Sequence, residues 1–113
     1  LGFRHDVAAL MMAADGVVIS SEREGFSYVC AEALLSGKPI ISTNVPIANE
    51  FLPTRSICSA KTSEDFARYL NQDLEALTSS QADARKIACE KLTLQAMTKQ
   101  TLAVYQKAID HGQ

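Results

Sequence analysis

The sequence is poor in the residues that mark several common classes of protein. It has no Trp and two His, and no apolar run reaches the roughly 18 residues that a membrane span needs. Basic residues are not in excess, since 11 Lys and Arg stand against 13 Asp and Glu for a net charge of −2. A nucleic-acid-binding face is therefore not expected. No basic segment followed by an apolar stretch marks a signal peptide, so we expect a cytoplasmic protein.

Cysteine is also sparse. Cys30, Cys58 and Cys89 are widely spaced among apolar neighbours. A disulfide framework or a metal site needs closer spacing or partner histidines, and His5 and His111 lie near opposite ends of the chain. We therefore expect three reduced, buried thiols and no metal site.

The 113 residues suit one compact domain, in which helical and strand patterns alternate. Short β-branched runs at 17–20 and 39–42 are typical of strands buried on both faces of a parallel sheet, and 56–58 is a candidate edge strand. The helices that periodicity predicts cover residues 7–14, 27–36, 48–51, 63–70, 73–78, 81–90 and 94–109. This alternation predicts an α/β, Rossmann-like, three-layer fold whose parallel sheet is only partly present.

One stretch of the sequence contains the pattern best suited to bind a ligand. The strand that ends at Ser20 is followed by a loop containing Gly25, and a helix begins near Ser27. Ligands of open α/β sheets bind outside the carboxyl ends of the strands. A helix start offers free N–H groups and partial positive charge, which suit a phosphate. We also expect Ser27 to cap the helix or to add a hydroxyl to a bound anion.

Two carboxylates flank this helix start. Glu24 lies in the loop and Glu32 lies about one turn inside the helix. Carboxylates accept hydrogen bonds from sugar hydroxyls, so the arrangement fits the hexose, diphosphate and ribose of a nucleotide sugar. Spacing alone leaves open the alternative that both are ordinary solvated residues.

With its flanking residues, the stretch resembles the family-4 retaining glycosyltransferases of GT-B fold, whose signature is two glutamates separated by seven residues. The resemblance is dense up to about Pro53 and includes Leu1-Gly2-Phe3-Arg4, Glu24-Gly25-Phe26, Glu32-Ala33-Leu34, Gly37-Lys38-Pro39 and Thr43-Asn44-Val45-Pro46. It implies that residues 1–113 are part of the C-terminal, nucleotide-sugar-binding domain, in which the final helix often packs back across the domain cleft. The missing initiator Met also suggests that upstream sequence has been removed or lies elsewhere.

The resemblance implies a role for each matching position. Glu24 would be the catalytic contact to the hydroxyls of the transferred sugar, and Glu32 would bind the ribose. The backbone N–H groups that would face the sugar and the diphosphate are those of Gly25, Phe26, Ser27, Tyr28 and Val29. The base pocket would be lined by Gly2, Phe3 and Arg4. No metal is implied, because the helix dipole and basic side chains neutralise the diphosphate. No cofactor is implied, because the nucleotide sugar is itself a substrate.

The sequence also departs from the family pattern. Ser27 stands where Gly is usual, and Ile47-Ala48-Asn49 replaces a Gly-rich turn before Glu50. Nothing here matches the Arg and Lys that clamp the diphosphate, or the acceptor-binding N-terminal domain, which we expect as a partner.

The expected function is retaining transfer of a glycosyl group to a saccharide or lipid-linked acceptor. The complete enzyme would work in the cytoplasm or at the inner membrane face, whereas this chain by itself would be inactive. Two alternatives stay open: a non-catalytic binding or assembly module that forms a homodimer through an exposed sheet edge, and another GT-B enzyme such as a nucleotide-sugar epimerase.

Overall fold

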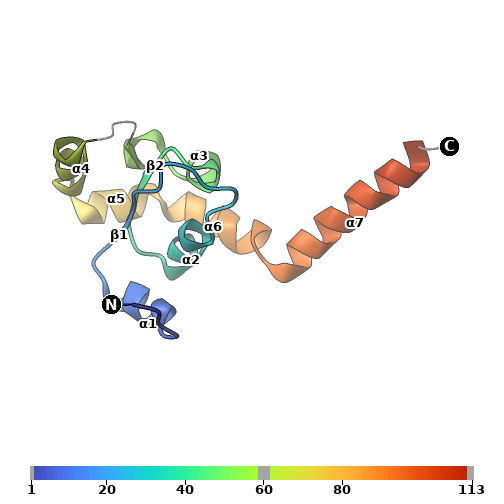
Figure 1. Ribbon diagram of the computed structural model, residues 1–113, viewed down its shortest axis with the longest axis horizontal. Helices are drawn as coiled ribbons and strands as arrows, with labels where there is room; N and C mark the ends of the chain where they lie inside the picture. The colour runs from blue at the N-terminus through green and yellow to red at the C-terminus, as the bar shows by residue number, and fades with distance from the viewer. Residues whose placement is uncertain (1, 59–61, 112–113) are drawn as a thin grey trace.

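The computed structural model describes residues 2–58 and 62–111, and within them helices and strands alternate as the sequence predicts. Figure 1 shows a small body from which one long helix projects. The elements follow one another in the order α1 (Val7–Ala13), β1 (Val17–Ile19), α2 (Tyr28–Ser36), β2 (Ile40–Thr43), α3 (Pro46–Phe51), a 3₁₀ turn (Thr54–Ser56), β3 (Ile57–Cys58), α4 (Ser63–Leu70), α5 (Leu74–Ser80), α6 (Ala82–Lys91) and α7 (Leu94–His111).

The three strands form one parallel sheet in the order β1-β2-β3. Val17 pairs with Ile40, and Ser42 pairs with Ile57, so all three carboxyl ends lie at the same edge. The central strand is buried on both faces, as expected, and β3 lies at an edge, as expected. The prediction was wrong for β1, where Val18 is 46% exposed. As the other edge strand, β1 is only partly covered on the face that Val18 shares with Ile41, where α4 and α5 pack.

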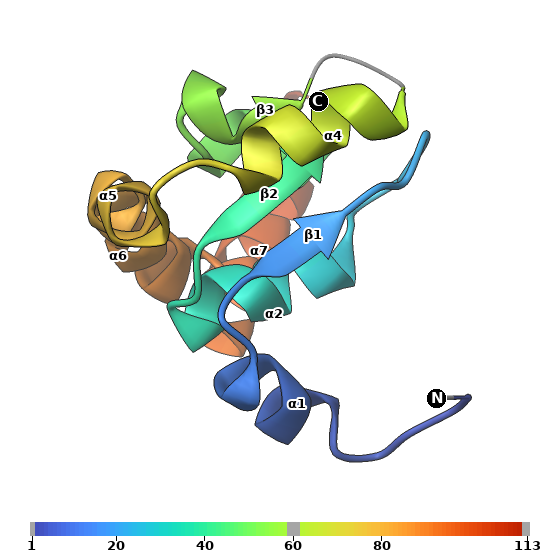
Figure 2. The same cartoon turned by 90° about the vertical axis from the view of Figure 1, so that its left-hand side faces the viewer.

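Helices cover both faces of the sheet and give the three layers that the sequence predicts (Figure 2). On one face, Ile40 belongs to a core shared with Leu34 of α2, Ile47 of α3 and Ala88 of α6. Side chains alternate along a strand, so the neighbouring Ile41 faces the opposite side, toward Leu70, Leu74 and Leu77 of α4 and α5.

Local signals fix where α2 ends. Gly37 takes the left-handed conformation with φ of 73°, and its N–H donates to the carbonyl of Leu34. Glycine adopts this conformation without the strain that a Cβ would bring. Pro39 follows and cannot extend a helix, so the chain turns directly into β2.

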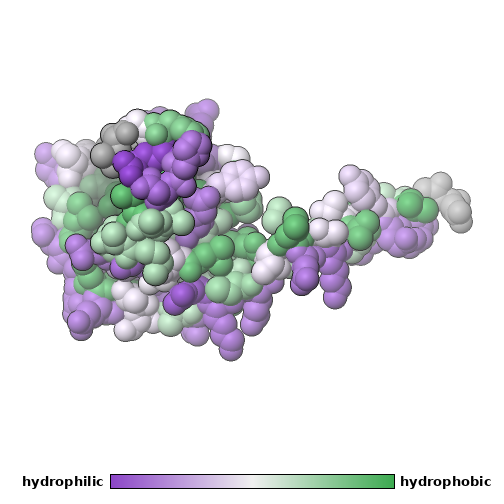
Figure 3. All heavy atoms as spheres, turned by 90° about the horizontal axis from the view of Figure 1, so that it is seen from below, coloured by the Kyte–Doolittle hydropathy of each residue, from purple (hydrophilic) through white to green (hydrophobic). Residues whose placement is uncertain are grey.

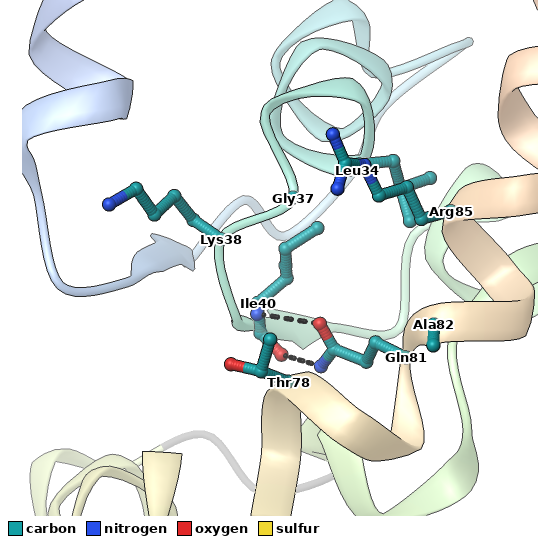
Figure 4. A pocket seen from close by; sticks show the side chains of 8 residues that line it. All are labelled: Leu34, Gly37, Lys38, Ile40, Thr78, Gln81, Ala82 and Arg85. Atoms are coloured by element: carbon teal, nitrogen blue, oxygen red, sulfur yellow. Dashed lines mark hydrogen bonds between the residues drawn. The ribbon is translucent and has the colours of Figure 1, made fainter. Parts of the chain in front are cut away.

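A buried glutamine joins α6 to the sheet. The side chain of Gln81 is 6% exposed. It accepts from the N–H of Ile40 at 3.0 Å and donates to the Ile40 carbonyl at 2.8 Å (Figure 4). It also donates to the Ser56 hydroxyl at 2.8 Å. The small pocket beside it, near Lys38 and Arg85, lies at the amino end of β2. It is therefore at the opposite end of the sheet from the predicted ligand site.

The last helix stands away from the body. None of the 18 residues of α7 is buried. Because α7 projects, the molecule is 56 Å long but measures only 30 Å along each of its other two axes (Figure 1). Apolar residues lie along it among polar ones (Figure 3). Leu102, Val104, Tyr105 and Ile109 are each more than half exposed, so no described residue covers its apolar face.

Two smaller expectations about individual side chains are corrected. Cys30 is buried as predicted, but Cys89 is exposed, because it lies on the solvent side of α6 beside the buried Ala88. The side chain of Cys58 lies outside the described part. Ser27 stands at the first position before α2, yet its hydroxyl makes no capping hydrogen bond.

Candidate functional site

The candidate site lies where the chain leaves β1 and enters α2, at the carboxyl edge of the sheet. A loop over residues 20–27 connects the two elements, and β2 ends beside it at Thr43. This is the position at which open α/β sheets bind ligands, as the sequence predicts. The loop and the segment before α1 lie on the same, right-hand side of Figure 2.

Hydrogen bonds from β2 hold the loop and one of its carboxylates. The hydroxyl of Thr43 donates to the carbonyl of Ser21 at 2.6 Å and lies 3.4 Å from that of Ile19. The hydroxyl of Ser21 in turn donates to Oε1 of Glu24 at 2.7 Å. Glu24 is therefore half-buried and oriented by the protein rather than freely solvated.

Sequence reasoning missed the two residues that orient Glu24. It assigned no role to Ser21, and Thr43 entered only as part of the segment Thr43-Asn44-Val45-Pro46. One signal was available: both hydroxyl residues follow or end a predicted strand, and parallel strands bring such positions to the same edge.

The start of α2 combines unpaired donors with a buried hydroxyl. The carbonyl of Ser27 accepts from the N–H groups of Cys30 and Ala31, whereas its side chain caps nothing, so the N–H groups of Tyr28 and Val29 gain no acceptor from it. The Ser27 side chain is 2% exposed, and its oxygen has no hydrogen-bond partner among the described residues. Buried hydroxyls are normally paired, so Ser27 is an exception among the described residues.

The second glutamate lies on the outer side of α2. Glu32 is exposed and shares a helix face with Tyr28, four residues earlier and 71% exposed. Tyr28 packs edge-to-face on Phe26, with 5.2 Å between ring centroids. Glu32 and Glu24 thus lie after and before the helix start, as the spacing predicts.

The predicted base-pocket residues precede α1. Arg4 pairs with Asp6 through two hydrogen bonds, and the Asp6 side chain makes no capping hydrogen bond to α1. Phe3 is 89% exposed and lies edge-to-face against His5. The described residues do not enclose Gly2, Phe3 or Arg4, and the base pocket stays a prediction.

The carboxylate of Glu24 also acts on a neighbouring thiol. The pKa of Cys30 is raised from 9.0 to about 11, first by burial and second by the negative charge of Glu24. Between pH 9 and about pH 11, the Cys30 thiol stays protonated to a greater extent in the folded chain than in the unfolded chain. The contribution of the Cys30 thiol to the free energy of unfolding is therefore complete below about pH 9 and is lost as the pH rises toward 11.

This difference predicts selective alkylation of the thiols. At about pH 8, iodoacetamide should modify the exposed Cys89 at least tenfold faster than Cys30, because only a thiolate in contact with solvent reacts. Peptide mapping by mass spectrometry separates the two sites. In denaturant the two rates should converge, and equal rates in the native chain would contradict the buried position of Cys30.

The described residues contain neither a metal-binding cluster nor a membrane-spanning helix. No group of three or more His, Cys, Asp or Glu side chains there could hold a metal ion. Nor is any helix of the described ranges both long and apolar enough to cross a bilayer.

A parallel sheet with helices on both faces, and a helix that starts from a loop at its carboxyl edge, define a partial Rossmann-like α/β domain. The chain belongs to the group 1 glycosyl transferases, whose family model matches residues 1–76. The fold is the partial Rossmann-like domain expected of a GT-B protein of this family.

A curated relative agrees with this family. The chain is 31% identical over 111 residues to the MMP alpha-(1->4)-mannosyltransferase of Mycolicibacterium hassiacum. The match covers 92% of this chain but 27% of that protein, so the chain spans about a quarter of its relative's length. No solved structure matches the chain significantly.

Proposed function

We propose that this chain supplies the donor-binding part of a retaining, family-4 glycosyltransferase. Its complete enzyme would transfer a glycosyl group from a nucleoside diphosphate sugar to a saccharide or lipid-linked acceptor. The family model and the mannosyltransferase relative support glycosyl transfer in general. The relative's name makes a mannosyl donor the first one to test.

The observation that carries this proposal is the helix start at Ser27. A buried hydroxyl without a partner among the described residues, two N–H groups of a first helical turn and an oriented carboxylate lie in or beside one loop. The N–H groups and the helix dipole would bind the diphosphate, whose charge grows as it leaves. They would do so together with cations of the complete enzyme, so the proposal involves no metal or cofactor.

The two glutamates take different parts in the proposed mechanism. Glu24 would hold the hydroxyls of the transferred sugar and so fix the orientation of its reacting carbon. Glu32, on the exposed face of α2, would accept hydrogen bonds from the ribose. The base would lie toward Gly2, Phe3 and Arg4.

Titration of the 113-residue chain with UDP-, GDP- and ADP-mannose tests the donor site. In ¹H–¹⁵N spectra we expect weak, saturable shifts of the amides from Gly25 to Val29, with dissociation constants of about a millimolar or above. Glu32→Ala should weaken binding about fivefold, since it removes one charged acceptor. Glu90→Ala, which removes an exposed glutamate from α6, should leave binding unchanged.

The pattern of shifts decides between outcomes. Shifts that gather around Lys38 and Arg85, at the opposite end of the sheet, would move the anion site away from α2. Equal binding by the Glu32→Ala and Glu90→Ala variants would remove the ribose assignment.

A further inference from the structure

The first residue of α2 exposes a large aromatic side chain beside the candidate site. Tyr28 is 71% exposed, and its neighbours Phe26 and Val29 are 39% and 47% exposed. Single apolar side chains at a surface need no explanation, whereas several that gather in one place mark a binding surface. The resemblance assigns only the backbone N–H of Tyr28 to a ligand, so the side chain has no role yet.

Contact with Phe26 fixes the direction of the Tyr28 ring. The two ring centroids lie 5.2 Å apart, with 66° between the ring planes. Phe26 precedes α2, in the loop over residues 20–27. Helical side chains lean toward the N-terminus of their helix, which at the first position leads over the preceding loop. The Tyr28 ring therefore lies over the end of the loop rather than along α2 toward Glu32.

This direction brings a phenol hydroxyl to the side of the helix start where an anion would bind. The N–H groups of Tyr28 and Val29 gain no acceptor from the Ser27 side chain. An anion held by such N–H groups lies just beyond the N-terminal end of the helix. A phenol hydroxyl can donate to an anion there, and a hydrogen bond to a charged oxygen is about twice as strong as a neutral one.

The order of the groups in a nucleotide sugar favours the diphosphate as the partner of Tyr28. Glu32, the residue proposed for the ribose, lies one turn further along α2. A base stacked on the Tyr28 ring would lie on the loop side of that ribose, where the diphosphate belongs. The diphosphate also offers several charged oxygens, whereas the transferred sugar is assigned to the carboxylate of Glu24.

We propose that the Tyr28 hydroxyl donates a hydrogen bond to the diphosphate of the nucleotide sugar, and that Phe26 positions the ring for this contact. The inference rests on the proposed function, because it deepens the assignment of the diphosphate to the start of α2. The hydroxyl adds a side-chain donor to the backbone N–H groups. Its hydrogen bond strengthens as the departing diphosphate gains negative charge.

Titration of the 113-residue chain with inorganic pyrophosphate at constant ionic strength isolates this contact, because the probe contains no sugar, ribose or base. In ¹H–¹⁵N spectra we expect saturable shifts of the Tyr28 and Val29 amides, with a dissociation constant of about 10 mM. Tyr28→Phe removes only the hydroxyl and should weaken binding about fivefold. Tyr105→Phe is the matched control and should leave binding unchanged, since Tyr105 is 64% exposed on α7.

A double-mutant cycle tests the positioning role of Phe26. Phe26→Leu should weaken pyrophosphate binding about threefold in the chain with Tyr28, but should have no further effect in the Tyr28→Phe chain. Weakening of equal size in both chains would show that Phe26 acts on the loop and not through the hydroxyl. Circular dichroism verifies that each variant keeps its fold.

The outcomes separate this inference from the proposed donor site. Nucleotide-sugar shifts from Gly25 to Val29, combined with equal pyrophosphate affinity of the Tyr28→Phe and Tyr105→Phe chains, would overturn the hydroxyl contact alone. If neither probe shifts these amides, even at about 100 mM pyrophosphate, the donor site is refuted and the contact with it. A selective loss of pyrophosphate affinity in the Tyr28→Phe chain supports the contact.

Discussion

Replacing Glu24 with Ala in the complete enzyme is expected to lower kcat about 100-fold, with a much smaller change in the KM for the donor. In this structure the Glu24 carboxylate is held by Ser21, which is itself held by Thr43 of β2. A carboxylate fixed in this way loses little freedom when it binds a sugar. Its removal should therefore affect orientation of the reacting centre more than overall affinity.

Steady-state kinetics with a saturating acceptor measures this effect, and three variants complete the test. Ser21→Ala should lower kcat about tenfold, because Glu24 keeps its charge but loses its support. Glu32→Ala should instead raise the donor KM with kcat nearly unchanged. Glu22→Ala removes a neighbouring exposed carboxylate and should have no effect. A Glu24→Ala enzyme with normal kcat would refute the catalytic assignment.

Replacing Gln81 with Ala is expected to destabilise the fold by about 3 kcal/mol, equivalent to a loss of roughly 15 °C in Tm. The substitution removes three hydrogen bonds at once and leaves the N–H and carbonyl of Ile40 and the hydroxyl of Ser56 without their partner. All three groups are buried, so water cannot readily replace the amide.

Urea unfolding followed by circular dichroism measures the change in the free energy of unfolding. Gln95→Ala should shift it by less than about 0.5 kcal/mol, because this exposed residue of α7 makes no comparable bonds. Gln81→Glu is the sharper variant: it keeps the size of the side chain but cannot donate to the Ile40 carbonyl. It should also destabilise the fold strongly, and a stable Gln81→Glu chain would contradict the role of the amide.

Most element positions could be predicted, because their signals are local. Gly37 and Pro39 end α2, Thr62 accepts from the N–H of Asp65 at the start of α4, and Asp73 caps α5. Each signal acts within a few residues of the chain and needs no tertiary partner.

Exposure on the sheet and on the helices was less predictable. The run Val17-Val18-Ile19 is apolar throughout, yet Val18 is half exposed, since α4 and α5 cover the edge strand only in part. Cys89 likewise follows the buried Ala88 and faces solvent. Apolar character favours burial, but the neighbouring elements determine it.

The sequence by itself determined the order of strands and helices, the loop between β1 and α2, and the two glutamates on either side of the helix start. Tertiary structure alone decided which groups orient Glu24, since Thr43 and Ser21 are 22 residues apart, and which residue joins α6 to β2, since Gln81 and Ile40 are 41 apart. The physical reason is the separation along the sequence between the groups that interact. Caps and turns depend on backbone geometry within a few residues, whereas these hydrogen bonds exist only after the parallel sheet has brought distant segments together.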